Sequence, residues 1–175
     1  MPARNRKSME RESSPEATNI ITLLRQAHWE IKNLLREMDA ILDLPAALFE
    51  LYPRIRIALE AHAAGEAFAL YGPMREIPGL STGLRRGEAA HEEIDRTLRV
   101  LDRRPSRKEQ LDSPEWKETF RQLHRTVLAH LAEEEENIFP RLEQLLAESR
   151  LDALGDRYKR GLKGELAPVS RQLQR

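Results

Sequence analysis

The sequence predicts an all-α protein, an antiparallel four-helix bundle with an up-down-up-down course, on three observations. Charged residues make up 33% and hydrophobic residues 40% of the 175 positions, with Leu, Ala, Glu and Arg prominent, which is typical of amphipathic helices. Four segments of about 20 to 35 residues carry apolar side chains at three- and four-residue spacing. The connections between these segments are short, which favours antiparallel neighbours within a single domain.

The first helix follows a basic, Ser-rich arm over residues 1–15 that has no periodicity and is expected to be disordered. We expect the helix to begin near Pro15 or Thr18, with Ser14 or Thr18 as its cap. Its apolar stripe continues to about Leu42.

Proline and glycine delimit the second and third helices. The second begins at Pro45, contains Pro53 as a position that favours a kink, and is expected to end at Gly72-Pro73. Residues 73–81 hold two prolines and a glycine, so they predict a loop. The third helix follows over about residues 82–102.

The fourth helix has the clearest start, because Ser113-Pro114-Glu115 combines a capping serine with a proline at the first helical position. Its pattern continues to about Ser149. Residues 16–150 are thus predicted to form the bundle, and residues 151–175 a short carboxy-terminal helix and tail.

Each predicted helix interrupts its own apolar face with a histidine. On the first helix, for example, His28 lies at helical spacing between Leu24 and Ile31. The second and fourth helices add a glutamate four residues after the histidine, on the same face. The six inward-facing polar residues are His28, His62, Glu66, His91, His130 and Glu134.

Burial of these six groups requires a partner, because an imidazole needs a hydrogen bond and an unpaired carboxylate costs several kcal/mol. A divalent cation would satisfy all of them. An internal repeat agrees with this interpretation, because His28 and His91 lie 63 residues apart, and the two His-x-x-x-Glu pairs lie 68 apart. The chain therefore resembles two helical hairpins, each supplying three ligands to a site able to hold two ions.

Composition excludes other classes of function. The 29 basic and 29 acidic residues cancel, which argues against nucleic acid as a partner. The absence of cysteine excludes disulfides and thiolate ligands. No apolar run approaches the roughly 20 residues that cross a bilayer, so no membrane association is expected, and a cytoplasmic location is the expectation because no signal-peptide core is seen.

The motifs resemble the hemerythrin-like, or HHE cation-binding, family over about residues 17–149. The similarity is carried by Gln26-Ala27-His28, His62-x-x-x-Glu66 with Leu70-Tyr71, Glu88-x-x-His91-Glu92-Glu93, and His130-x-x-x-Glu134-Glu135 with Ile138-Phe139-Pro140. The resemblance implies a non-haem di-iron centre bridged by two carboxylates and an oxygen atom. Glu66 and Glu134 would be the bridges and the four histidines terminal ligands, with dioxygen or a related small oxidant as the partner.

This chain differs from the oxygen carriers of the family at two places that bear on oxygen carriage. Oxygen carriers of the family have a second histidine where this chain has Asp95, and their last pair is His-x-x-x-x-Asp. Asp95 could coordinate weakly, accept a ligand's N–H or form an exposed ion pair, and we do not count it as a ligand.

Tyr71 is expected to pack, with a lesser chance of tuning oxygen access. His124 and the acidic run of Glu133, Glu135 and Glu136 are expected to be a flank residue and a solvated face.

Three uses of the site stay open from the sequence. The first is a non-enzymatic protein that holds iron and binds or senses oxygen, or handles iron. The second is an enzyme that turns over peroxide or nitric oxide, for which the missing histidine leaves an open position. The third is a structural or signalling bundle whose metal supports folding and whose terminal arms bind a protein partner.

Overall fold

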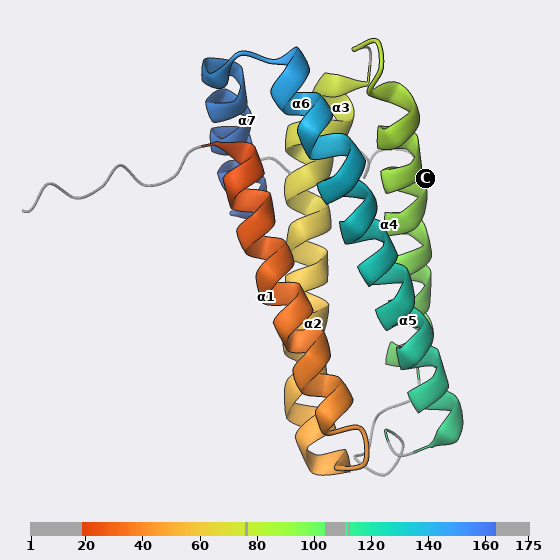
Figure 1. Cartoon of the computed structure of the whole chain (residues 1–175). Helices are drawn as coiled ribbons and strands as arrows, with labels where there is room; N and C mark the ends of the chain where they lie inside the picture. Colours follow the sequence, from red (N-terminus) through yellow and green to blue (C-terminus); the bar gives the residue numbers. More distant parts are fainter. Residues whose placement is uncertain (1–18, 76, 104–110, 112, 164–175) are drawn as a thin grey trace, which may run out of the picture.

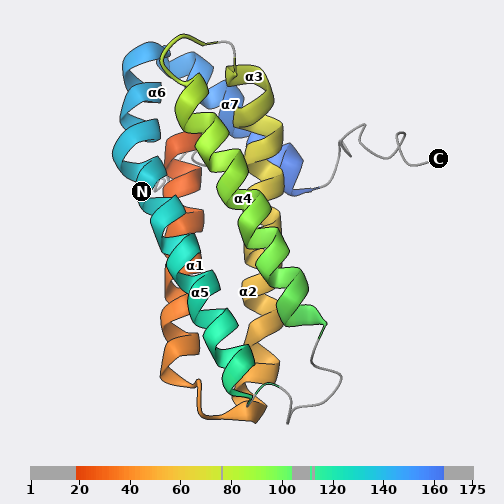
Figure 2. The same ribbon diagram turned by 90° about the vertical axis from the view of Figure 1, so that its right-hand side faces the viewer.

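The computed structural model describes residues 19–75, 77–103, 111 and 113–163, and in these ranges the protein is helical without a strand. Its four long helices are α1 (Ile20–Ala40), α2 (Pro45–Glu66), α4 (Ser81–Asp102) and α5 (Pro114–Glu133). They lie side by side as a bundle (Figures 1 and 2). The all-α class is confirmed, whereas the predicted arm and the end of the tail lie outside the described residues.

Side-chain caps fix two helix starts. Asn19 caps α1, since its Oδ1 accepts a hydrogen bond from the N–H of Ile21 at 2.9 Å. The helix therefore begins at Ile20, and the proposed caps Ser14 and Thr18 lie outside the described residues. Ser113 caps α5 as the sequence predicts, and its Oγ accepts from the N–H of Trp116 at 3.1 Å.

The second helix does not end where the sequence predicts. After Glu66 it continues as a π-helical segment, η1 (Ala67–Tyr71), and then as α3 (Gly72–Met74). Pro73 does not break it, because the proline lies at the start of the new α-helical turn, where a backbone N–H is not needed. Pro53 likewise lies inside α2, which continues past it.

The fourth helix also ends differently from the prediction. It passes through a second π-helical segment, η3 (Glu134–Ile138), and continues as α6 (Phe139–Leu145). Leu146 then adopts an extended backbone, and the last described helix, α7 (Glu148–Leu162), begins before the predicted boundary at Ser149. The two π-helical segments lie within one residue of matching positions of the repeat, since η1 begins directly after Glu66 and η3 begins at Glu134.

Helix α7 packs against α1, α2 and η1. Tyr158 is buried over Gly65, where a Cβ atom would lie closer to the ring than van der Waals contact. Gly161 also lies against the backbone of Gly65. Glycine at 65 thus allows α7 to cover the bundle at the level of Glu66. The predicted division of the chain at residue 150 stays a prediction.

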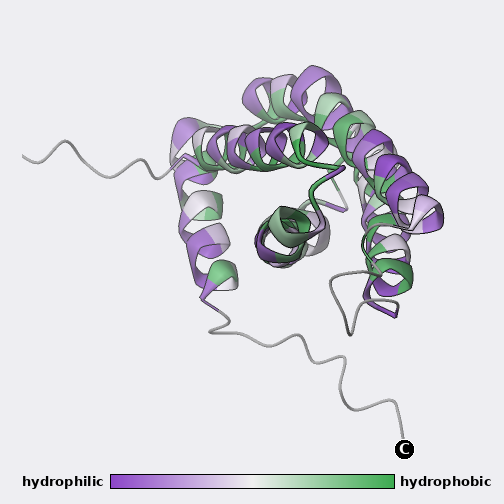
Figure 3. Ribbon diagram, turned by 90° about the horizontal axis from the view of Figure 1, so that it is seen from below, coloured by the Kyte–Doolittle hydropathy of each residue, from purple (hydrophilic) through white to green (hydrophobic). Residues whose placement is uncertain are grey.

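The core consists of two hydrophobic clusters stacked along the bundle. The lower cluster, at the α1–α2 turn, includes Tyr52, Trp116 and Phe120. The upper cluster, at the opposite end, includes Phe139 and Tyr158. Figure 3 shows hydrophilic and hydrophobic residues alternating along the helices, as amphipathic packing requires.

None of the helices in the described part of the chain has the length and apolar character needed to cross a membrane.

Candidate metal centre

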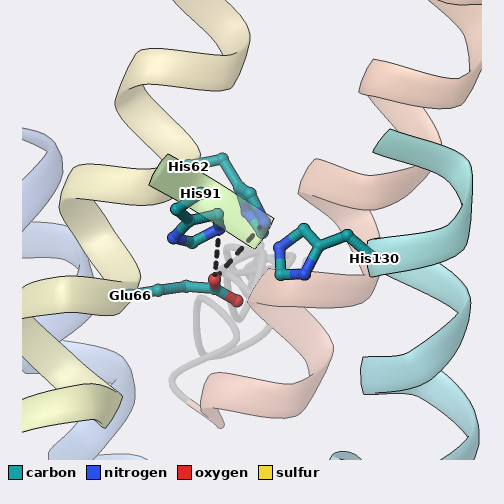
Figure 4. Close-up of side chains that lie close together, drawn as sticks. All are labelled: His62, Glu66, His91 and His130. Carbon is teal, nitrogen blue, oxygen red and sulfur yellow. Dashed lines mark ion pairs between the residues drawn. The ribbon is translucent and has the colours of Figure 1, made fainter. Parts of the chain in front are cut away.

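All six polar residues singled out from the sequence meet between the lower and upper clusters. Five are at most 5% exposed, and the side chain of His91 is 13% exposed. Their ligand atoms form two groups, in each of which the atoms lie within 4.8 Å of one another. The outer group is His62, Glu66, His91 and His130, shown in Figure 4. The inner group is His28, His62, Glu66 and Glu134.

The buried ligand atoms lack hydrogen-bond partners. The Nε2 atoms of all four histidines are buried without one, as are Glu66 Oε1 and Glu134 Oε2. Buried polar atoms are normally hydrogen-bonded, so a set of unpartnered atoms from four helices calls for a ligand. The simplest such ligand is a metal ion, which accepts lone pairs from all of these atoms.

The spacing of the donors agrees with a shared ion. Glu66 Oε2 lies 3.5 Å from His62 Nε2 and 3.3 Å from His91 Nε2. Glu134 lies 3.3 Å from His28 Nε2 and 3.7 Å from His130 Nε2. Donors bound to one metal at about 2.0–2.2 Å lie roughly 3.0–3.4 Å apart at common coordination angles. The residues present therefore fit a metal ion with little rearrangement.

Burial favours the neutral form of His62, His91 and His130. It lowers the pKa of His91 to about 4, with a further contribution from His130, and it lowers the pKa values of His62 and His130 as well. A neutral imidazole has a free lone pair, which is the form that coordinates a metal.

The two carboxyl groups respond oppositely to their surroundings. Burial raises the pKa of Glu66, and the nearby Glu134 carboxylate adds to this effect. Burial also acts to raise the pKa of Glu134, but the close contact with His28 and the surrounding histidines outweigh it and lower the pKa to about 2. Without a cation, the pair favours one shared proton, held at Glu66.

Tyr71 links the two carboxylates. Its Oη lies 3.1 Å from Glu66 Oε2 and 3.2 Å from Glu134 Oε1. The π-helical segment makes this possible, because its hydrogen bonds span five residues and Tyr71 follows Glu66 by five. On the other side Gly87 leaves room for the hydroxyl, since a Cβ atom there would lie 2.7 Å from Oη. Tyr71 is therefore part of the site and not only a packing group.

Glu135, expected on a solvated face, instead contacts the site. Its Oε1 accepts a hydrogen bond from His28 Nδ1 at 2.8 Å and lies 2.7 Å from Lys32 Nζ. A carboxylate in this position fixes the Nδ1–H tautomer and turns Nε2 toward the metal. Burial acts to raise the pKa of Glu135, but the hydrogen bonds with Lys32 and His28 outweigh this effect and lower the pKa.

The remaining candidates lie away from the ligand atoms. Asp95 is exposed and paired with Arg99 at 2.7 Å, which agrees with an ion-pair role. His124 is partly buried on α5, 2.9 Å from Asp39. Glu133 pairs with Arg86, and Glu136 is exposed.

A groove between α2 and α4 gives access to the outer group. It has a volume of about 770 Å³, and His62, His91 and His130 all line it. His28 and Glu134 of the inner group do not. The cluster thus has one covered half and one accessible half.

These features define a class: a helical bundle with a buried His/Glu cluster able to hold a metal ion. The comparison with family models agrees, since the hemerythrin HHE cation-binding domain matches residues 19–155. The chain therefore belongs to the hemerythrin HHE cation-binding domain family. Comparisons with curated proteins and with solved structures gave no match.

Proposed function

We propose that the chain binds two iron ions between the lower and upper clusters, and that the loaded site binds or senses dioxygen or a related small oxidant, or serves in iron handling. An up-down-up-down course of the four long helices would bring one histidine from each to this level. Cytoplasmic location is part of the same proposal.

The unpartnered buried atoms support the proposal most strongly. Each buried donor or acceptor left unsatisfied costs about 1–3 kcal/mol, so six in one place would be a large cost without a ligand. Neutral imidazoles and carboxylates suit iron, manganese and zinc alike. Iron follows from membership of the family and not from the donor set.

The residues have distinct tasks in this proposal. Glu66 and Glu134 would each offer an oxygen to both ions, and the histidines would hold the ions through Nε2. Bound iron supplies reversible one-electron chemistry. Tyr71 holds a proton beside the carboxylates, and Glu135 fixes the orientation of His28. The ring of Phe139, 5.3 Å from that of His28, helps to keep water from the covered half.

Metal analysis tests the proposal. After anaerobic iron loading, we expect about two iron ions per chain, as in di-iron bundles. The optical spectrum in air should then show near-ultraviolet absorption of ferric iron, which a zinc protein lacks. Less than one iron per chain would argue against the proposal. His130→Ala should lower the iron content, whereas His124→Ala on the same helix should not, because His124 lies outside the cluster.

A second candidate function is turnover of peroxide or nitric oxide. The accessible position of His91 favours it, together with Asp95, which pairs with Arg99 and leaves the ion of the outer group without a further protein ligand. Hydrogen peroxide consumption by iron-loaded but not metal-free protein, lost in His91→Ala, would support it. Loaded protein that leaves peroxide unchanged at physiological concentration would leave binding or sensing as the function.

A further inference from the structure

The groove beside the outer group is much larger than a small oxidant requires. Its volume of about 770 Å³ falls in the range of roughly 300–1,000 Å³ typical of pockets for organic ligands. It starts at the ligand atoms of the outer group, so a molecule bound there would reach the metal position directly. The size and the position together indicate an organic ligand.

The groove provides space for an apolar chain. From His91 to Leu98 along α4 the distance is roughly 10 Å at about 1.5 Å per residue, and over this stretch Ile94 and Leu98 line the groove beside the charged Glu92 and Asp95. Small residues, among them Ala63 on α2 and Ala67 at the start of η1, leave the space open. The apolar wall consists of Leu59, Ile94, Leu98, Val127 and Leu131.

The charges at the inner end of the groove favour an anion. Two divalent ions bring four positive charges, and Glu66 and Glu134 neutralise two of them, because the histidine ligands are neutral. An ion held by the outer group would lie beside the groove that His62, His91 and His130 line, and a negatively charged oxygen donor would add to its coordination from there.

Ion pairs reduce the negative charge at the mouth of the groove. Three of its four acidic residues are paired with arginines, and the fourth, Glu92, is exposed. The pairs are Arg75–Glu88, Arg99–Asp95 and Arg56–Glu60. The pairing lowers the negative potential that an anion meets at the mouth.

We propose that the groove binds an organic monocarboxylate with a medium-length apolar tail. Its carboxylate binds the metal at the outer group, and its tail lies along Ile94 and Leu98. The inference rests on the proposed metal-binding function and names a ligand class for the accessible half of the same site.

Calorimetric titration of the iron(II)-loaded full chain under anaerobic conditions tests the ligand class. Octanoate should bind about tenfold or more tightly than acetate, because the two share a head group and differ in the apolar tail. Octanoate should also bind more tightly than octylamine, whose cationic head would face the metal. Acetate or octylamine binding as tightly as octanoate would overturn the proposal.

Two alanines on opposite sides of α2 test the location. Ala63→Leu puts a larger side chain into the groove and should weaken octanoate binding about tenfold while acetate binding is unchanged. Ala61→Leu is the control, since Ala61 lines a smaller cavity of about 280 Å³ beside α1 and α7. Unchanged octanoate binding in Ala63→Leu would overturn the location. If Ala63→Leu does not fold, Ala67→Leu, at an exposed position of the same groove, replaces it.

The metal content of each sample separates the two proposals. Metal-free protein should lose octanoate binding, and equal binding with and without metal would overturn the carboxylate–metal contact. A chain that takes up no metal refutes the proposed function and the carboxylate site with it. A chain that holds metal but binds octanoate no more tightly than acetate refutes the carboxylate site alone.

Discussion

The inner and outer groups share His62 and Glu66 but differ in their surroundings. In the inner group His28 is fully buried, hydrogen-bonded to Glu135 and packed near Phe139. In the outer group His91 is partly exposed and lines a groove. Under the proposed function, this difference predicts that one half of the site holds its ion firmly and the other exchanges ligands. Substitutions that act on both halves, on one half, or on their link can test this division.

The largest effect is expected at Glu66, which belongs to both groups. Glu66→Gln keeps the size of the side chain but removes a buried negative charge, so both metal positions should be lost. Metal analysis should find less than about a tenth of the wild-type metal content, since the loss exceeds the 10–100-fold effects of outer-shell changes. Glu60→Gln, at an exposed position of the same helix, is the control. Full metal content in Glu66→Gln would show that the carboxylate is not a ligand.

The second effect should be confined to the inner half. Glu135→Ala removes the acceptor that orients His28, and loss of such a partner typically lowers metal affinity about 10–100-fold. Competition with a chelator measures the affinity. The matched control is Glu136→Ala, because Glu136 is exposed in the same acidic run. Equal losses in the two variants would point to general charge and not to the His28 contact.

A smaller effect is expected from the link between the halves. Gly87→Ala places a Cβ atom 2.7 Å from Tyr71 Oη, which must push the hydroxyl away from the two carboxylates. We expect metal affinity to fall by about tenfold, at the low end for an outer-shell change. Gly72→Ala is the control, since its Cβ atom would be no nearer than 4.0 Å to any neighbour.

A double-mutant cycle tests whether this effect acts through the hydroxyl. In a Tyr71→Phe background, Gly87→Ala should cost much less affinity than in the wild-type chain, because the displaced group is already absent. Additive losses would mean that Gly87 acts on the site by another route.

The smallest effect concerns the pH dependence of the metal-free protein. The folded pKa of His91 is about 4, against an ordinary value of 6.5, so between these values the unfolded chain binds a proton that the folded chain does not. The contribution of His91 to stability should therefore fall as pH falls through this window and level off below about 4. His62 and His130 act in the same direction, whereas Glu66, whose pKa is raised, acts in the opposite one.

Urea midpoints at pH 7 and pH 5 measure this contribution. The midpoint should decrease less in His91→Gln than in the wild-type chain, because glutamine does not titrate. Equal decreases in the two proteins would show that His91 is not the source of the pH dependence.

The sequence was sufficient to find the six clustered residues, because helical periodicity decides which face a side chain occupies. His28 falls between Leu24 and Ile31 on the buried stripe, and the structure buries it there. The same periodicity could not reveal the π-helical segments, since it assumes one uniform helix. The predicted end at Gly72-Pro73 was wrong because proline is tolerated where a new turn begins. The fourth helix ends at Leu145, short of the predicted end near Ser149, because Leu146 adopts an extended backbone.

The contact of Glu135 with His28 could not be predicted either. The two residues are 107 positions apart, and no local pattern distinguishes Glu135 from its acidic neighbours. Lys32, one helical turn after His28, was the available signal, because a cation on that flank favours a facing carboxylate.

The π-helical segments make the length of the chain at these two places critical. Each accommodates one residue more than the α-helical stretch it replaces. If residues 67–71 were wound as a regular α-helix with no residue removed, every later residue of that helix would be turned by about 100° around its axis. Tyr71 would leave the carboxylates, and Met74 would leave the upper cluster. A replacement of either stretch by regular α-helix therefore has to remove one residue to keep the later side chains in place.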